Sequence, residues 1–421
     1  MSELNLSILI LAHNEGGNLG PLIERTSQVL SRMELSWEVV VIDGGSIDGT
    51  CAEAEAAGAK VFVQANPGYG NALREGFERS RGEYVLCLDA DLSHDPEFIA
   101  RMWDWRDRAD VVIASRYVSG GSAEMPWFRW VLSRCLNVIY GHVLAIGVKD
   151  MSSGFRMYRS SVLRQIQTQG RDFDLLEELL LKIYAGGWRL QEVPFEYRPR
   201  KEGRTHARLI SFARSYLKTL GSLWQLRNSI QCADYDFRAF YSRIPLQRWW
   251  QRQRHRHIRE LVKPGTSILD VGCGSSKILV DLPLAVGLDP SMGKLRFMRR
   301  TNTRLLRGSG ARLPFADNLF ETVISSQVIE HCLDAEEILD ELVRVAAPGG
   351  SLIVGTPDYD RISWVWIEKV YGWVHRGGYA DEHVTHYTQA SLKAALLSRG
   401  CEIQEVRYVA GSELIIKAKK S

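Results

Sequence analysis

The sequence lacks any long uncharged apolar run, because Arg129 and Arg134 interrupt the most apolar segment, 127–148. A membrane-spanning helix needs about 18 or more consecutive apolar residues, so no transmembrane helix is predicted. The N-terminus, MSELNLSILILAHNE, lacks the basic start and small-residue cleavage site of a signal peptide. The seven cysteines are scattered and never spaced as CxxC, which argues against a disulfide framework and a cysteine zinc site. Together these absences predict a cytoplasmic protein.

Repeats and low-complexity tracts are also absent, and the composition is that of an ordinary globular protein, with 45% hydrophobic and 24% charged residues. At roughly 150 residues per domain, 421 residues predict two or three domains.

Charge is unevenly distributed along the chain, although the net charge is only +3. Residues 1–110 contain 9 Lys and Arg against 19 Asp and Glu, residues 111–262 contain 25 against 12, and residues 263–421 contain 19 of each. The basic middle segment would attract phosphates or an anionic membrane surface. No nucleic-acid-binding signature accompanies it, so no nucleic acid partner is expected.

The first 110 residues alternate strand-like and helix-like patterns. Short apolar runs rich in β-branched residues occupy 6–11, 37–42, 60–63 and 84–88, and a helical stretch occupies 71–80. This pattern predicts a parallel sheet covered on both faces, in which ligands gather at the carboxyl ends of the strands.

Polar clusters follow three of these strands. His13-Asn14-Glu15 follows the first strand, Asp43-Gly44-Gly45-Ser46 ends the second, and Asp89-Ala90-Asp91 ends the fourth. Two carboxylates one residue apart suit a divalent cation that also binds diphosphate oxygens. An isolated DxD is more often a simple acidic turn, but three polar clusters at one sheet edge indicate an active site.

The first half resembles the family 2 glycosyltransferases, closest to the dolichol- or polyprenyl-phosphate mannose synthase type. The resemblance covers most of residues 6–227. It rests on AHNE (12–15), VIDGGSIDGT (41–50), GYGNALREGF (68–77), LDADLSHDPE (88–97), SRY (115–117), SSGFRMYR (152–159) and LQEVPFEY (190–197) with the following RPRKEGRTHARL. It implies a GT-A fold that transfers a sugar, with inversion, from a nucleoside diphosphate sugar and uses Mg²⁺ or Mn²⁺.

The resemblance also assigns roles by position. The residues expected to bind the nucleotide sugar are Ala12, Asn14, Glu15, Asp43, Asp89, Asp91 and Arg200, of which Asp89 and Asp91 would hold the metal ion. The residues expected to act in catalysis are Asp91, Arg116, Arg134 and Glu178. The two arginines would hold an acceptor phosphate, and the neighbouring Glu177 leaves the register of Glu178 open.

The acceptor and the sugar stay open at this point. Many lipid-phosphate mannose synthases have two acids where this chain has Asp43-Gly44, so the donor is GDP-mannose or a UDP-sugar. A phosphate monoester is already an oxyanion and needs positioning arginines, whereas a sugar hydroxyl needs a carboxylate base such as Glu178. Polyprenyl phosphate is the preferred acceptor and a glycan hydroxyl the alternative.

Two basic segments with aromatic residues bear on a lipid acceptor. Residues 207–227 and 127–146 each combine apolar and basic positions at helical spacing. Such helices suit peripheral contact at a membrane surface, and core packing would produce the same pattern.

A second alternating α/β series begins near 266, with strand-like runs at 267–271, 285–288, 321–325 and 351–354. ILDVGCGSS (268–276) joins a strand to a helix through glycines, and Asp289 ends the next strand. With ARLPFADNLFETVISSQVIEH (311–331) and APGGSLIVGTP (347–357), this series resembles the class I S-adenosylmethionine-dependent methyltransferases. Ser276 stands where a dinucleotide site would have its third glycine.

This second resemblance implies S-adenosylmethionine as the cofactor. The positions expected to bind it are Asp270, Gly272, Gly274, Asp289, Ala311, Leu313 and Gln327. Glu330 and His331 would face the transferred methyl group, and His331, His383 and His386 are candidate bases. The alternative is a module that binds the cofactor and transfers nothing.

The sequence therefore predicts two doubly wound α/β domains, a GT-A nucleotide-diphospho-sugar fold over 1–228 and a Rossmann-like methyltransferase fold over 263–421. Residues 229–262 are the predicted linker, and the Arg- and Trp-rich part of it, 243–259, is expected to form a helix that leads into the methyltransferase. The predicted function is bifunctional, with methyl transfer in the same glycan or lipid pathway as the sugar transfer.

Overall fold

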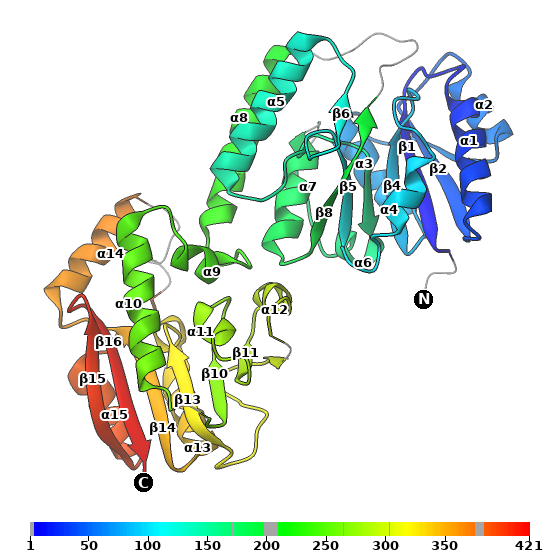
Figure 1. Ribbon diagram of the computed structural model, residues 1–421. Helices are drawn as coiled ribbons and strands as arrows, with labels where there is room; N and C mark the ends of the chain where they lie inside the picture. Colours follow the sequence, from blue (N-terminus) through cyan, green and yellow to red (C-terminus); the bar gives the residue numbers. More distant parts are fainter. Residues whose placement is uncertain are drawn as a thin grey trace. The chain divides into compact units, whose positions relative to one another are not determined.

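A computed structural model of the chain describes residues 4–170, 172, 174–197, 209–263, 265–302, 304–374 and 383–421. It forms two compact units, one of Met1–Tyr184 with Trp188–Trp224 and the other of Ala185–Gly187 with Gln225–Ser421 (Figure 1). The division into 1–228, 229–262 and 263–421 stays a prediction. The fold class of two doubly wound α/β domains is confirmed by the two sheets described next.

The first unit is built on a seven-stranded sheet in the order β3-β2-β1-β4-β7-β5-β8, in which β7 runs antiparallel to its neighbours. Its strands are β1 (Leu6–Ala12), β2 (Trp37–Asp43), β3 (Lys60–Val63), β4 (Tyr84–Asp89), β5 (Val111–Ser115), β7 (Arg156–Arg159) and β8 (Leu190–Pro194). A small second sheet pairs β6 (Ser122–Ala123) with β9 (Glu196–Tyr197). The helices that accompany them are α1 (Leu19–Arg32), α2 (Thr50–Ala56), α3 (Tyr69–Arg79), α4 (Phe98–Trp103), α5 (Trp127–Leu144), α6 (Ser160–Leu163), α7 (Asp174–Ala185) and α8 (Leu209–Asn228). The four strands predicted in the first 110 residues are confirmed.

Successive side chains of β1 point to opposite faces of the sheet, and both faces are covered by helices. Ile8 and Ile10 pack with Leu22 and Ile23 of α1, while the intervening Leu9 contacts α3. Gly76 permits that second contact, because a Cβ there would lie 2.4 Å from Leu9 Cδ1. Because side chains on both faces of the sheet are buried, successive residues of β1 from Ile8 onward are apolar.

The second unit is built on a sheet in the order β12-β11-β10-β13-β14-β16-β15, with β16 antiparallel to both of its neighbours. Its strands are β10 (Ile268–Val271), β11 (Val286–Asp289), β12 (Leu305–Arg307), β13 (Phe320–Ser326), β14 (Ala346–Pro357), β15 (Cys401–Val409) and β16 (Glu413–Lys420). The helices are α9 (Tyr235–Phe240), α10 (Pro245–Leu261), α11 (Lys277–Val280), α12 (Met292–Met298), η1 (Ile329–His331), α13 (Ala335–Val345), α14 (Ile362–Val374) and α15 (Gln389–Ser398).

The predicted basic helix 243–259 corresponds to α10, which packs on one face of this second sheet. Ile258 and Leu261 are buried there, and Arg254 and Trp250 donate hydrogen bonds to the buried carboxylate of Glu413 on β16. The opposite face is covered by α13 and α15. The Arg-rich helix α10 therefore packs its apolar side chains against the sheet.

Within the described part of the chain, no helix has both the length and the hydropathy to cross a bilayer. All seven cysteines are free thiols.

Candidate functional site

Three strand ends meet at one edge of the first sheet. β1 lies between β2 and β4, all three are parallel, Ala12 pairs with Asp43, and Leu11 pairs with Asp89. The polar clusters that follow these strands are therefore brought together, at the edge where parallel α/β sheets bind ligands.

Asp43 holds the loop that follows β2. Its carboxylate accepts hydrogen bonds from the backbone N–H groups of Gly45 and Ser46, each at 2.9 Å, and from the Ser46 hydroxyl. Burial would raise the pKa of Asp43, but these hydrogen bonds outweigh it and hold the pKa below its ordinary value. Asp43 is thus an ionised carboxylate with both oxygens already engaged.

The loop after β1 is joined to the loop after β2. The backbone N–H of Asn14 donates to Ser46 Oγ at 2.8 Å, and Asn14 Oδ1 accepts from the backbone N–H of Ile47 at 3.1 Å. Asn14 has φ +56°, a left-handed conformation that asparagine adopts more readily than most residues. Glu15 is fixed through its backbone, which donates to Thr50 Oγ1 at 2.9 Å.

Asp89 and Asp91 lie at and just beyond the end of β4. Asp91 is buried and its Oδ1 accepts the backbone N–H of Ser93, whereas the Asp89 side chain is 44% exposed. His94 Nδ1 accepts a hydrogen bond from the Asp89 backbone N–H, so the ring proton is on Nε2. The Nε2 atom lies 3.4 Å from Asp89 Oδ2. Because Mg²⁺ is commonly bound by one or two carboxylates together with substrate phosphates, this hard oxygen pair fits such an ion.

Gly154 lies beside Asp89. A Cβ on Gly154 would be 3.4 Å from Asp89 Oδ1 and 3.6 Å from the Tyr69 hydroxyl. Burial and the Asp89 charge raise the pKa of Tyr69 well above its ordinary value, so Tyr69 stays a neutral hydroxyl.

Arg116 and Arg134 converge on Tyr117. Their guanidinium carbons lie 5.2 and 5.1 Å from the centroid of the Tyr117 ring. Arg116 is held in place by Asp150, with bonds of 2.8 and 2.7 Å from Nε and Nη2. Burial lowers the pKa of Arg116, but the pairing with Asp150 raises it more, so the cation is fixed. Arg134 belongs to α5.

The two neighbouring glutamates of α7 have different surroundings. Glu178 accepts backbone hydrogen bonds from Gln169 and Gly170 and lies 2.6 Å from Lys182 Nζ. Glu177 is fully buried, neither of its oxygens has a hydrogen-bond partner among the described residues, and burial raises its pKa to about 8. Arg200 lies outside the described residues.

In the second unit, the glycine loop after β10 has two left-handed positions. Gly272 has φ +70°, and a Cβ there would lie 2.3 Å from the Val328 side chain. Gly274 has φ +53°, and a Cβ there would lie 2.5 Å from Asp236 Oδ2. Glycine is required at both positions by backbone conformation and by close contacts.

Asp270 and Asp289 are buried acids at the ends of β10 and β11. Asp289 accepts the backbone N–H groups of Gly274 and Ser291, each at 2.8 Å. Burial nevertheless raises the pKa of Asp289. Burial and the nearby Asp289 charge raise the pKa of Asp270 to about 8, and Asp270 Oδ2 has no hydrogen-bond partner among the described residues.

The other residues predicted to bind the cofactor lie in the segments that follow β12 and β13. Leu313 is buried in the core beside the partly buried Ala311, and its backbone N–H donates to Glu341. Gln327 has φ +60°, and its side-chain Nε2 is buried without a hydrogen-bond partner among the described residues. Its backbone N–H is fixed by the Gly355 carbonyl at 2.8 Å.

Of the three candidate bases, His331 and His383 come together beside Glu330, while His386 stacks on Tyr359 with ring centroids 4.0 Å apart. Burial raises the pKa of Glu330 to about 8.

Several residues of these sites were missed by the sequence reasoning. His94 and Tyr69 lie inside two of the motifs that carry the family resemblance, LDADLSHDPE and GYGNALREGF. Their positions in these motifs were therefore a sequence signal for a place near Asp89. Asp236 and Lys294, which pair at 3.1 Å beside Gly274, carry no sequence signal because they are far apart in the chain.

Comparison with known proteins agrees with two enzyme domains. A family model described as glycosyl transferase family 2 matches residues 7–167, and one described as methyltransferase domain matches residues 269–354. Polyprenol monophosphomannose synthase of Mycolicibacterium smegmatis is 34% identical over 211 residues, which are 47% of this chain and 78% of that protein. Dolichol-phosphate mannosyltransferase of Pyrococcus furiosus is 30% identical over 212 residues, 48% of this chain and 59% of that protein.

Among solved structures, a SAM-dependent methyltransferase of Thermotoga maritima, described as a possible histamine N-methyltransferase, is similar to the second unit. It is 22% identical with a TM-score of 0.35, and the match covers 42% of this chain and 94% of that chain.

Proposed function

The chain belongs to glycosyl transferase family 2 and also carries a methyltransferase domain, and from this premise we propose that its first unit transfers a sugar to polyprenyl phosphate. The donor is a nucleoside diphosphate sugar, GDP-mannose or a UDP-sugar. The relatives named as polyprenol monophosphomannose synthase and dolichol-phosphate mannosyltransferase support this acceptor class.

One observation carries the choice of a lipid phosphate. Arg134, which converges with Arg116 on Tyr117, belongs to the helix that exposes the largest group of apolar side chains in the described chain. The exposed side chains of α5 include Trp127, Phe128, Trp130, Val131, Leu132, Val138, Ile139 and Val143. A polyprenyl phosphate has the matching chemistry, an anionic head group attached to an apolar chain. Peripheral contact of α5 with a lipid surface belongs to the same proposal.

The reaction needs little acid–base chemistry from the protein. An acceptor phosphate oxygen attacks the anomeric carbon while the bond to the nucleoside diphosphate breaks, so the configuration inverts and no proton is transferred. The guanidinium groups of Arg116 and Arg134 would position the acceptor. Glu178 is already engaged by two backbone N–H groups and Lys182, which argues against the alternative of a hydroxyl acceptor activated by this carboxylate.

Asp89 and Asp91 would hold Mg²⁺ or Mn²⁺ with the diphosphate. When bound there, the ion would neutralise charge on the leaving nucleoside diphosphate. The loops fixed by Asn14, Glu15 and Asp43 would hold the nucleoside part.

The test offers radiolabelled GDP-mannose, UDP-glucose and UDP-N-acetylglucosamine to the full chain with polyprenyl phosphate in vesicles. One donor is expected to give an organic-extractable product, and Arg134→Ala is expected to raise the KM for the lipid phosphate by about 10-fold or more. Arg164→Ala, which removes an exposed arginine elsewhere, is the matched control. Label that never enters the organic phase, or an Arg134→Ala variant with unchanged kinetics, would overturn the proposal.

For the second unit, the proposed function is methyl transfer from S-adenosylmethionine to a product of the same pathway. The match of residues 269–354 to the methyltransferase family supports the cofactor. Asp270, Gly272 and Gly274 would line the methionine part, Asp289 the ribose, Ala311 and Leu313 the adenine, and Gln327 the methyl group.

Calorimetry with S-adenosylmethionine on the full chain tests the cofactor assignment. A carboxylate that accepts hydrogen bonds from ribose hydroxyls contributes about 1.5–3 kcal/mol, so Asp289→Ala is expected to weaken affinity about 10–150-fold. Absence of binding heat in the wild-type chain, or equal affinity in the variant, would contradict it. A chain that binds the cofactor but never methylates a product of its first unit would be a binding module instead.

A further inference from the structure

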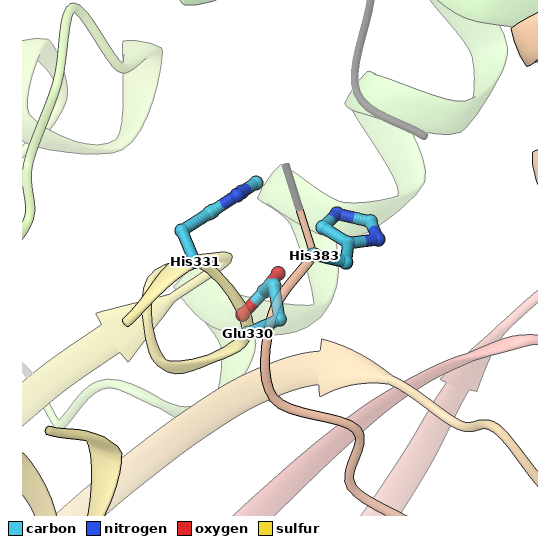
Figure 2. A group of neighbouring side chains, drawn as sticks. All are labelled: Glu330, His331 and His383. Carbon is cyan, nitrogen blue, oxygen red and sulfur yellow. The ribbon is translucent and has the colours of Figure 1, made fainter. Parts of the chain in front are cut away.

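Glu330, His331 and His383 form a compact group beyond the end of β13. Each contributes one potential ligand atom, and these atoms all lie within 4.8 Å of one another. Figure 2 shows the Glu330 carboxylate between the two imidazole rings, with Glu330 and His331 adjacent on η1 and His383 on a separate segment. Among the described residues, no other three histidine, cysteine, aspartate or glutamate side chains are grouped in this way.

The two segments that supply the group are tied together by their backbones. The N–H groups of Val384 and Thr385 donate to the Glu330 carbonyl oxygen at 2.9 and 3.1 Å. The hydroxyl of Thr385 donates to the Cys332 carbonyl at 2.6 Å. His383 is therefore held beside Glu330 by main-chain hydrogen bonds rather than by the side chains of the group itself.

Only one of the two carboxylate oxygens of Glu330 has a hydrogen-bond partner among the described residues. The residue is fully buried, its Oε2 accepts a 3.3 Å hydrogen bond from Thr356, and its Oε1 has no hydrogen-bond partner among the described residues. Burial of a carboxylate oxygen without a donor is unfavourable, and a bound cation would supply the missing positive charge.

The orientation of His383 is set by a carboxylate behind it. His383 Nδ1 lies 2.8 Å from Glu368 Oε1 and 2.8 Å from the Tyr359 hydroxyl oxygen, and the Tyr359 hydroxyl donates to Glu368 Oε1 at 2.9 Å. With Glu368 as the acceptor, Nδ1 carries the proton and Nε2 carries the lone pair. A carboxylate on the far nitrogen of a histidine is the arrangement that orients imidazole ligands in metal sites.

We propose that Glu330, His331 and His383 bind a divalent first-row transition-metal ion, with Glu368 as the positioning residue of His383. Two imidazoles and one carboxylate suit Zn²⁺, Co²⁺, Fe²⁺ or Mn²⁺ better than Mg²⁺, which prefers oxygen ligands and keeps several waters. Three protein ligands leave at least one coordination position for water or substrate.

The site has a consequence for the methyltransferase, which rests on the proposed methyl transfer. A hydroxyl oxygen of the acceptor in the open position would lose its proton to solvent more readily. That oxygen would then form the bond to the methyl carbon as the carbon–sulfur bond breaks and its electron pair stays on sulfur. In this arrangement His331 and His383 are ligands and neither is the base.

The experiment measures metal binding by the full chain without S-adenosylmethionine or acceptor, so its outcome is independent of whether methyl transfer occurs. The chain carries Asp91→Asn to weaken the other metal site, is stripped with chelator, and is titrated with Co²⁺ and Zn²⁺. Calorimetry gives the affinity, elemental analysis gives the stoichiometry, and the cobalt absorption spectrum reports imidazole ligation.

One equivalent of Co²⁺ or Zn²⁺ is expected, with affinity lowered at least 10–100-fold by His331→Ala or His383→Ala and by a comparable factor by Glu368→Gln. His257→Ala is the matched control and is expected to bind like the parent chain. An unchanged thermal unfolding midpoint of the metal-free protein shows that each variant is folded. No bound equivalent in the parent, or equal affinity in parent and both histidine variants, would overturn the site.

Discussion

Asp89 and Asp91 are held differently, although they are one residue apart. Asp91 is buried and fixes a turn through Ser93, whereas Asp89 is half-exposed beside His94. Asp91→Asn keeps an oxygen for the Ser93 hydrogen bond and removes only the charge. We expect it to lower turnover of the nucleotide sugar about 100-fold or more, because a charge that neutralises the leaving diphosphate is lost.

This prediction is measured as sugar transfer at fixed Mn²⁺, with Asp95→Asn as the control, since Asp95 pairs with Arg25 on the surface. Wild-type turnover in the Asp91→Asn variant, or full activity in excess chelator, would contradict the metal role.

A second residue-level prediction concerns Asp270, whose pKa is raised to about 8 by burial and by Asp289. An unfolded aspartate has a pKa of about 3.9, so the folded chain retains a proton that the unfolded chain has released between these values. The contribution of Asp270 to the stability of the cofactor-free second unit should therefore be fully present below about pH 4 and fall as the pH rises toward 8, by at most about 1.4 kcal/mol per pH unit.

Asp270→Asn removes this titration and should make the fall in stability with rising pH less steep. Hydrogen exchange of peptides from β10 and β11, followed in urea between pH 5 and 9, measures it, with peptides from β4 as the internal reference. Parallel profiles for variant and wild type would show that Asp270 is ionised in the folded state.

At the level of elements, α5 exposes more large apolar side chains than any other helix in the described part of the chain. Trp127 and Trp130 are exposed, and Arg134 lies on the same helix. Replacing both tryptophans by serine should weaken binding to anionic vesicles about 10-fold or more, because each aromatic ring buries apolar area in the interface. Co-sedimentation at low and high salt measures the effect.

Leu284→Ser is the control for that experiment, because Leu284 is an exposed apolar residue outside α5. Equal vesicle binding by the tryptophan variant and this control would show that α5 does not contact lipid.

Four strands in each large sheet were predictable because apolar runs with β-branched residues indicate burial on both faces, and the runs at 6–11 and 84–88 appear as β1 and β4. The remaining strands of these sheets, β5, β7, β8, β12, β15 and β16, were not predicted. Rotation of a helix about its own axis was not predictable. Glu177 and Glu178 are adjacent on α7, and only packing determines that Glu177 is buried without a hydrogen-bond partner in the described chain while Glu178 accepts bonds from a loop. The pairing of His383 with Glu368 likewise depends on two segments that only the fold brings together.

At the scale of the whole molecule, each unit has its own sheet and its own core, and each places its candidate site at the ends of its parallel strands. No residue proposed for sugar transfer belongs to the second sheet, and none proposed for the methyl donor belongs to the first. Covalent linkage would raise the effective concentration of one unit's product at the other without any shared catalytic residue.

This separation predicts that the two activities are independent in the full chain. Substitutions that share no partners have additive effects within about 0.3–0.5 kcal/mol, or about 2-fold. Asp91→Asn should therefore leave the affinity for S-adenosylmethionine within about 2-fold of wild type, and Asp289→Ala should leave sugar transfer within the same limit. Calorimetry and the radiolabel assay measure the two effects on the same preparations. A change of about 10-fold or more in either crossed measurement would mean that ligand binding in one unit is coupled to the site of the other unit.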